Sequence, residues 1–422
     1  MKEHKIAVIG LGYVGLPLAR LFSTKYNVIG YDINEKRVEE LNKGIDSTLE
    51  VDNKLLEIAI NTKMLVCTTN KEDIRDCNIY VVAVPTPVDD KYKPDLTPLI
   101  KSSELVGSVV KKNDIVIYES TTFPCCTEEV CVPEIEKASG LKYNKDFFVG
   151  YSPERINPGD KEHTVEKIKK VTSGSNEKTS LIVDELYNSV LLNGTFRASS
   201  IKVAEASKII ENTQRDINIA FFNELAKIFN AMGIDTKEVV DAASTKWNFI
   251  RLSPGLVGGH CIGVDPYYLI QKAEDYKVNP VLIKSGRQVN EDMSDYIANK
   301  IIHHINKRGI LVKGSNILVM GVTFKENCPD IRNTKVVKIY NKLSEYTNNI
   351  TVVDGYCNKQ FAKDELGVDV VEKIPNKKYD VVVLAVPHEN YLDINYNDYL
   401  SENGFVYDVK SVLPKNDNTI RL

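Results

Sequence analysis

Short apolar runs recur along the first 151 residues, and glycine, proline or a polar residue ends or directly follows each one. They are Lys5–Ile9, Asn27–Asp32, Ile79–Val84, Ile115–Tyr118 and Phe147–Tyr151. Runs of this length, rich in β-branched residues, are typical of strands buried on both faces of a parallel sheet. The intervals between them leave room for helices. The pattern therefore predicts an α/β domain with a doubly wound sheet.

The C-terminal part of the chain repeats this pattern. Its apolar runs are Asn316–Gly321, Ile350–Asp354, Tyr379–Pro387 and Phe405–Asp408. Between the two parts, Ser199 and Ser200 precede a helical pattern that continues to Met232 and stops at Gly233. We therefore expect two α/β domains joined by a helical segment with a long central helix. Helices that bridge domains in this way commonly supply dimer contacts.

A glycine-rich turn follows the first predicted strand directly. Gly10, Gly12 and Gly15 form a G-x-G-x-x-G sequence, and Asp32 ends the next strand 22 residues after Gly10. The glycines permit a tight turn, close approach of a pyrophosphate and close packing of the following helix, and the acid binds an adenosine ribose. The motif predicts a Rossmann-like domain that binds NAD rather than NADP, with Arg37 near enough to brace the cofactor. A glycine-rich turn in another kind of α/β domain is the alternative.

These patterns divide the chain into three expected domains. We predict an NAD-binding Rossmann domain at residues 1–198, a helical central domain at 199–300 and a second Rossmann-like domain at 313–422. The first turn of the last domain holds Thr323-Phe324-Lys325 in place of G-x-G. We therefore expect that domain to hold a different nucleotide, partly through lysine.

Polar residues follow three of the predicted strands: Thr86, Thr121 and Glu154. Ligands of open parallel sheets lie beyond the carboxyl ends of the strands, so these side chains are placed to line a cofactor cleft. Turn or cap residues are the alternative interpretation.

Composition narrows the class of protein. The net charge is −4, from 54 Lys+Arg and 58 Asp+Glu, which gives no basic field for nucleic acid. Apolar runs are too short for a membrane span or a signal peptide. The eight cysteines contain no C-x-x-C pair, which argues against a zinc ribbon, another metal site or a disulfide scaffold. We expect a cytoplasmic protein with reduced thiols.

Two further features carry candidate chemistry. Lys208, Asn212 and Arg215 share one face of the long predicted helix, either as a solvated face or as ligands of a polar group. Cys261 lies in a stretch with four glycines, and Asp265 follows it. A thiol of pKa about 8.5 is partly ionised at neutral pH and is already a nucleophile, and a lysine such as Lys208 would increase the ionised fraction. We interpret Cys261 as a nucleophile, with buried filler as the alternative.

Taken together, the motifs resemble those of the UDP-glucose/GDP-mannose dehydrogenase family along essentially the whole chain. They are GLGYVG, VPTP, EST, SPER, the Lys208–Asn212 pair, GGHC-x3-D and GVTFK-x6-R. Val264 stands where UDP-glucose members usually carry lysine, and Gly150–Gly159 is similar to the UDP-N-acetylglucosamine and UDP-N-acetylgalactosamine 6-dehydrogenases of bacterial surface polysaccharide pathways. A UDP-N-acetylmannosamine or UDP-glucose enzyme is the alternative within the family.

The resemblance implies a role for each matched residue. It implies contacts to NAD by Gly10, Gly12, Tyr13, Val14, Gly15, Asp32, Arg37, Thr86, Thr121 and Arg332. It implies contacts to the UDP-sugar by Arg155, Ile156, Lys208, Asn212, Arg215, Gly258, Phe324 and Lys325. It also implies catalytic roles for Cys261, Lys208, Asp265, Asn212, Glu154 and Thr121, and a homodimer. One departure concerns an arginine that reaches across the dimer in related enzymes, because Trp247 stands near that position and Arg251 is the closest arginine.

The reaction that the resemblance implies is a four-electron oxidation of the sugar C6 alcohol to a carboxylate with two NAD⁺. Two other functions remain open from the residues alone. A two-electron β-hydroxyacid dehydrogenase shares the N-terminal domain and bridging helix but needs neither Cys261 nor the second Rossmann-like domain. A non-catalytic NADH sensor would bind without turnover.

Overall fold

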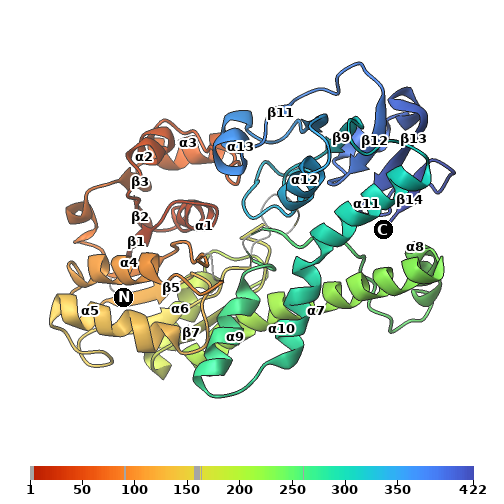
Figure 1. Cartoon of the computed structure of the whole chain (residues 1–422). Helices are drawn as coiled ribbons and strands as arrows, with labels where there is room; N and C mark the ends of the chain where they lie inside the picture. The colour runs from red at the N-terminus through yellow and green to blue at the C-terminus, as the bar shows by residue number, and fades with distance from the viewer. Residues whose placement is uncertain (1–3, 90–91, 156–161, 163, 260) are drawn as a thin grey trace. The chain divides into compact units, whose positions relative to one another are not determined.

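The structure, a computed structural model, describes residues 4–89, 92–155, 162, 164–259 and 261–422. It contains two compact units (Figure 1). Unit 1 comprises residues 1–211 and 267–278, and unit 2 comprises residues 212–266 and 279–422. Each unit is described by itself.

The described part of unit 1 contains an eight-stranded sheet in the order β3-β2-β1-β4-β5-β6-β7-β8. The strands are β1 Lys5–Ile9, β2 Asn27–Tyr31, β3 Leu65–Thr68, β4 Ile79–Val82, β5 Ile115–Tyr118, β6 Phe148–Tyr151, β7 Lys170–Gly174 and β8 Thr195–Arg197. All neighbours pair in parallel except β6 and β7, which pair antiparallel. The first six strands have the order of a Rossmann domain, as predicted.

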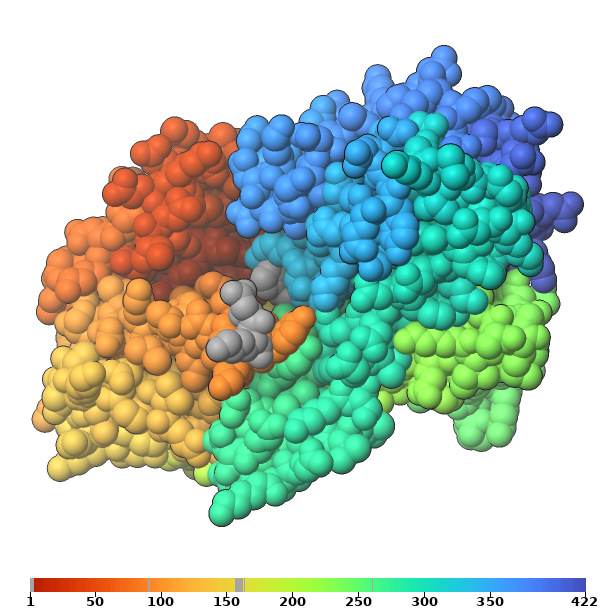
Figure 2. All heavy atoms as spheres, in the orientation of Figure 1, coloured from red at the N-terminus to blue at the C-terminus, as the bar shows by residue number. Residues whose placement is uncertain are grey.

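Helices cover both faces of this sheet. Figure 1 shows α1–α3 on one face and α4 and α5 on the other. Their bounds are α1 Gly15–Phe22, α2 Glu35–Asn42, α3 Asn53–Asn61, α4 Thr97–Gly107, α5 Val132–Ser139 and, later in the chain, α6 Glu177–Asn188. Helices α4 and α5 form part of the outer surface of unit 1 (Figure 2).

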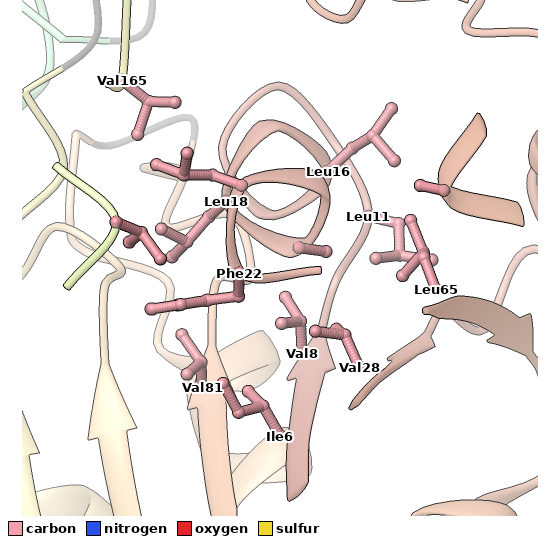
Figure 3. Close-up of a cluster of buried hydrophobic side chains, with 14 of the residues drawn as sticks. Ile6, Val8, Leu11, Leu16, Leu18, Phe22, Val28, Leu65, Val81 and Val165 are labelled. Carbon is pink, nitrogen blue, oxygen red and sulfur yellow. The ribbon is translucent and has the colours of Figure 1, made fainter. Parts of the chain in front are cut away.

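The core of unit 1 lies between α1 and the central strands. Leu18 and Phe22 of α1 face Val8 of β1 and Val81 of β4 (Figure 3), and all four side chains are fully buried. Val28 of β2 extends the same cluster. Burial on both faces explains why the sequence of these strands is continuously apolar rather than alternating.

The described part of unit 2 contains a six-stranded sheet, entirely parallel, in the order β11-β10-β9-β12-β13-β14. The strands are β9 Ile317–Met320, β10 Ile350–Val353, β11 Val370–Val371, β12 Tyr379–Leu384, β13 Leu400–Asp408 and β14 Thr419–Arg421. The helices that belong wholly to unit 2 are α8 Thr236–Ala243, α10 Val281–Glu291, α11 Met293–Lys307, α12 Val336–Ser344, α13 Lys359–Leu366 and α14 Glu389–Leu392. The strand order is again that of a Rossmann domain, so the predicted fold class is confirmed.

Two helices contribute to both units. Helix α7 runs from Ile201 to Met232 and α9 from Asp265 to Asp275. The Ser200 hydroxyl accepts a hydrogen bond from the Val203 backbone at the start of α7, and Gly233 follows its end with a φ of 73°. The predicted long helix is therefore present. Helix α11 continues to Lys307, and the predicted domain boundaries at 198, 300 and 313 remain a prediction. No helix among the described residues is long and apolar enough to cross a membrane.

Candidate active site

The first βα turn of unit 1 has the geometry that a dinucleotide requires. Gly10 has a φ of 91°, and a Cβ on Gly15 would lie 1.8 Å from the carbonyl oxygen of Gly10. A Cβ on Gly12, in contrast, would meet no atom within 4 Å. Two glycines therefore serve the tight turn and the helix packing, while the third leaves the backbone open to a ligand at the amino end of α1. Tyr13 and Val14, beside Gly12, are half-buried.

Asp32 is held at the end of β2 by backbone groups. Its carboxylate accepts hydrogen bonds from the backbone of Leu11 at 2.8 Å and of Asn34 at 2.9 Å. The residue is half-buried, so the carboxylate is fixed in place and keeps some access to solvent. This arrangement fits the ribose of NAD.

Arg37 braces the same turn from inside the protein. Its Nε donates to the carbonyl oxygen of Leu11 at 3.0 Å and its Nη2 to Asp46 at 2.8 Å. The residue is 8% exposed. The Arg37 side chain therefore supports the glycine-rich turn by binding the backbone carbonyl of Leu11.

The polar residues predicted at the strand ends lie at one edge of the unit 1 sheet. Thr86, Thr121 and Glu154 follow β4, β5 and β6, which are parallel neighbours. The two threonines are half-buried, and Glu154 is 8% exposed. Arg155 pairs with Glu211 at 2.7 Å. Ile156, predicted to contact substrate, lies outside the described residues.

A buried charged cluster beneath this edge was not predicted. The Lys170 ammonium lies 2.6 Å from the Glu119 carboxylate, and both side chains are fully buried. The Tyr187 hydroxyl donates to the other oxygen of Glu119. Burial raises the pKa of Glu119 to about 7. No local pattern in the sequence marks these residues, because they come from the residue after β5, from β7 and from α6.

The three polar residues predicted to share one face of the long helix lie on α7, and their exposure increases along the helix. Lys208 is 6% exposed, Asn212 is half-buried and Arg215 is exposed. One turn before Lys208, the fully buried Glu205 accepts hydrogen bonds from the backbone of Cys125 and Thr127. Burial raises the pKa of Glu205 to about 7. The loop that follows Thr121 is therefore anchored on the start of α7.

Cys261 precedes the amino end of α9. Its carbonyl oxygen accepts a hydrogen bond from the backbone N–H of Asp265 at 2.8 Å, so the turn leads directly into the helix. Cys261 is partly exposed, whereas Asp265 is 2% exposed. The side-chain amide of Asn212 donates to the Asp265 carboxylate. The positive end of the α9 dipole favours a negative charge in the first turn of the helix, where Asp265 lies.

The glycines before Cys261 are required by packing against Phe324. Gly259 has a φ of 79°, and a Cβ there would lie 2.8 Å from the Phe324 ring. A Cβ on Gly258 would lie 2.9 Å from the carbonyl oxygen of Asn333, whose side chain donates to the carbonyl of Gly259. The glycine-rich segment before Cys261, called the thiol loop below, therefore packs against the first βα turn of the second Rossmann-like sheet. A small cavity there is lined in part by Gly258, Phe324 and Lys325. His260 lies outside the described residues.

Other residues singled out in the sequence occupy varied positions in unit 2. Arg332 is bound to the carboxylate of Asp330, with distances down to 2.6 Å. Trp247, near the position of the cross-dimer arginine, is 92% exposed. Arg251 is paired with Asp241. Within the described part of the chain, no group of His, Cys, Asp and Glu is arranged to hold a metal ion.

Unit 2 also contains an acid that corresponds to Asp32. Asp354 follows β10, as Asp32 follows β2, and it accepts a hydrogen bond from the backbone of Val322 at 2.8 Å. It is fully buried, however, and His388 lies 3.2 Å from its carboxylate. Thus the acid of the second sheet has no access to solvent.

A polar network under the thiol loop also escaped prediction. The Asn223 side chain bonds both backbone groups of Gly255, and Asn290 joins it to Asp216. Arg287, 2% exposed, pairs with Asp216 at 2.6 Å. Asp216 and Asn223 lie on α7, whereas Arg287 and Asn290 lie on α10, and no motif connects the two helices, so only the fold brings them together.

Comparison with known proteins assigns all three parts of the chain to one family. Residues 4–191, 202–292 and 318–415 match, in order, the NAD binding, central and UDP binding domains of the UDP-glucose/GDP-mannose dehydrogenase family. A UDP-N-acetyl-D-glucosamine 6-dehydrogenase of Pseudomonas aeruginosa is 53% identical over the full length of both chains. Protein CapL of Staphylococcus aureus is 52% identical over 97% of this chain and 96% of its own.

Solved structures agree with this assignment. The structure of a UDP-D-ManNAc dehydrogenase from Pyrococcus horikoshii has a TM-score of 0.90 and 29% identity, and the match covers 99% of this chain and 98% of that chain. The chain therefore belongs to the UDP-glucose/GDP-mannose dehydrogenase family and is an NAD-dependent nucleotide-sugar dehydrogenase.

Proposed function

We propose that this enzyme oxidises the C6 alcohol of a UDP-N-acetylhexosamine, of the gluco or galacto form, to the carboxylate. Two NAD⁺ and one water are consumed for each sugar, and two NADH are formed. The observation that carries the proposal is Cys261, held on a glycine loop before α9 with Asp265 as the first residue of that helix. The name of the 53% identical relative, a UDP-N-acetyl-D-glucosamine 6-dehydrogenase, supports the choice of an N-acetylhexosamine.

The glycine-rich turn and Asp32 hold the NAD⁺, with Thr86, Thr121 and Arg332 as further contacts. Bound NAD⁺ supplies the hydride acceptor for each of the two oxidations. Arg37 keeps the turn in shape through Leu11. The UDP-sugar is held by Arg155, Ile156, Arg215, Gly258, Phe324 and Lys325, together with the catalytic pair of α7.

In the first oxidation a base takes the proton of the C6 hydroxyl as the hydride leaves C6. Lys208 is one candidate for this base, and a water held by Thr121 and Asp265 is the other. The product of this step is an aldehyde.

The sulfur of Cys261 then attacks the aldehyde carbon and forms a thiohemiacetal. Loss of the second hydride converts this adduct into a thioester. Lys208 supplies a positive charge and Asn212 an N–H donor for the oxyanion in both covalent stages. Asp265 and Glu154 then direct a water at the thioester, which releases the uronic acid and returns the thiol. The covalent bond retains the reactive aldehyde between the two oxidations.

We further propose that the enzyme is a cytoplasmic homodimer that serves surface polysaccharide synthesis. Phe221, Ile228 and Met232 lie on one face of α7 and are 55%, 46% and 64% exposed, which supports a partner against this helix. None of the described cysteines forms a disulfide, which suits a reducing compartment. Sedimentation of the purified protein measures the assembly.

The test is the ratio of NADH to sugar, measured with UDP-N-acetylglucosamine, UDP-N-acetylgalactosamine, UDP-N-acetylmannosamine and UDP-glucose. We expect two NADH for each sugar consumed and the highest rate with one of the first two. Cys261→Ser should form no uronic acid at a comparable rate. One NADH for each sugar, or a clear preference for UDP-glucose, would contradict the proposal.

A further inference from the structure

Lys170 is a lysine in an unusual place. It is the first residue of β7, its side chain is fully buried, and it lies in the interior of unit 1. Lysine is almost never fully buried unless its charge is compensated, because an ammonium loses its hydration there. Its contacts therefore indicate what the position requires.

The Lys170 ammonium donates hydrogen bonds to two oxygens. One belongs to the Glu119 carboxylate at 2.6 Å, and the other is the backbone carbonyl of Pro153 at 3.1 Å. Tyr187 donates to Glu119 from the other side. The lysine also lies 5.5 Å from the centre of the Tyr187 ring.

These contacts connect the ends of two strands that carry proposed catalytic residues. Glu119 follows β5 and stands two residues before Thr121. Pro153 follows β6 and directly precedes Glu154, whose backbone N–H bonds the carbonyl of Glu119 at 3.3 Å. The position of the Glu154 backbone is therefore set on one side by Glu119 and on the other by Lys170 through Pro153.

A buried ion pair is a poor device for stability alone, because apolar residues of similar volume often stabilise as much. Building on the function proposed above, we propose that Lys170 is a positioning residue for Glu154. By holding the Pro153 carbonyl, it fixes the carboxylate of Glu154 where that group directs the water that hydrolyses the thioester. Lys170 itself touches no reacting atom.

The proposal predicts a selective defect in Lys170→Met, which keeps an unbranched apolar side chain and removes the ammonium group. We expect kcat to fall about tenfold or more and KM for the UDP-sugar to fall with it, so that kcat/KM changes by less than about twofold, because only the step after thioester formation is slowed. Two NADH per subunit should still form rapidly. The slow step should be hydrolysis, so the intact mass of quenched enzyme should show a uronyl adduct on the subunit.

A double-mutant cycle separates positioning from other effects. If Lys170 acts through Glu154, the variant Lys170→Met/Glu154→Gln should have the kcat of Glu154→Gln alone. Tyr187→Phe is the matched control, because it removes a hydrogen bond from Glu119 and leaves the Pro153 contact in place. Its kcat should stay within about twofold of the wild type. Additive losses in the cycle, or an equal defect in Tyr187→Phe, would overturn the proposal.

If Lys170→Met fails to fold, the neutral pair Glu119→Gln/Lys170→Met takes its place, since it leaves no unpaired buried carboxylate. Slow hydrolysis with a retained adduct supports the proposal, and a normal kcat overturns it. Failure of the proposed function is visible separately, as a wild-type enzyme that forms no NADH with any UDP-sugar. An active wild type with unaffected variants contradicts only the role of Lys170.

Discussion

The side-chain amide of Asn212 donates a hydrogen bond to the carboxylate of Asp265. One residue lies on α7 and the other begins α9, so the bond aligns the proposed oxyanion donor with the proposed water-directing acid. We predict that Asp265→Asn lowers kcat about 100-fold, because the amide oxygen still accepts the bond but the charge is lost. Steady-state kinetics measures the loss, and thermal unfolding should change little. A variant with full activity would show that the charge is not used.

The packing of Gly259 on Phe324 gives a second prediction. A Cβ on Gly259 would lie 2.8 Å from the Phe324 ring, so Gly259→Ala should abolish most activity. A side chain at a positive φ costs roughly 1–2 kcal/mol by itself. The clash with the ring should lower the free energy of unfolding by more than this amount.

Gly140→Ala is the matched control for Gly259→Ala. Gly140 has a φ of 71°, and a Cβ there would meet no atom within 4 Å. In thermal unfolding, Gly140→Ala should lose only the stability that the positive φ costs, and its kcat should be unchanged. Equal losses in the two variants would show that the Phe324 contact is not the constraint.

We predict that Glu205 makes the stability of unit 1 depend on pH. Its pKa rises from 4.5 to about 7 through burial, so the folded protein holds a proton that the unfolded chain has lost between these values. This group therefore lowers stability as pH rises from 4.5 to 7, by up to about 3 kcal/mol, and adds no further change above that window.

The comparison with Glu205→Gln tests this sign, because glutamine does not titrate. The difference in unfolding free energy, wild type minus variant, should decrease as pH rises from 4.5 to 7. Urea unfolding at several pH values measures it. A difference that is constant or increases across the window would contradict the prediction.

Arg37 is predicted to affect the cofactor through the turn that it supports. Arg37→Met breaks the bond to the Leu11 carbonyl and leaves Asp46 without its buried ion-pair partner, so KM for NAD⁺ should rise several-fold. The unfolding free energy should fall by about 3 kcal/mol, as for other buried pairs that lose one member. Lys36→Met, at the exposed neighbour, is the control and should change neither quantity.

Much of the fold follows from local patterns in the sequence. The apolar runs at Lys5–Ile9 and Ile115–Tyr118 coincide with β1 and β5, because a strand buried on both faces has an apolar sequence throughout. The G-x-G-x-x-G turn and Asp32 are also local, since one βα unit contains all of them. The antiparallel pairing of β7 with β6 was not predicted. The direction in which a strand runs depends on how the chain returns to the sheet, and the sequence of the strand itself does not show it.

The supporting residues of the site could not be predicted in this way. Lys170 and Glu119 are 51 residues apart, and Arg287 and Asp216 are 71 apart. Each is an ordinary charged residue in its own segment, and only burial makes it exceptional. Such pairs depend on long-range folding, which leaves no periodicity or motif in the sequence.

The first six strands of the eight-stranded sheet follow the same order as the six-stranded sheet, yet the acids at equivalent positions differ in exposure. Asp32 keeps access to solvent, whereas Asp354 is fully buried, accepts a hydrogen bond from the backbone of Val322 and lies 3.2 Å from His388. A ribose at the second sheet would therefore need an acceptor other than the Asp354 carboxylate. The two Rossmann-like sheets are therefore not interchangeable, and excess NAD⁺ should not compete with the nucleotide bound at the second sheet.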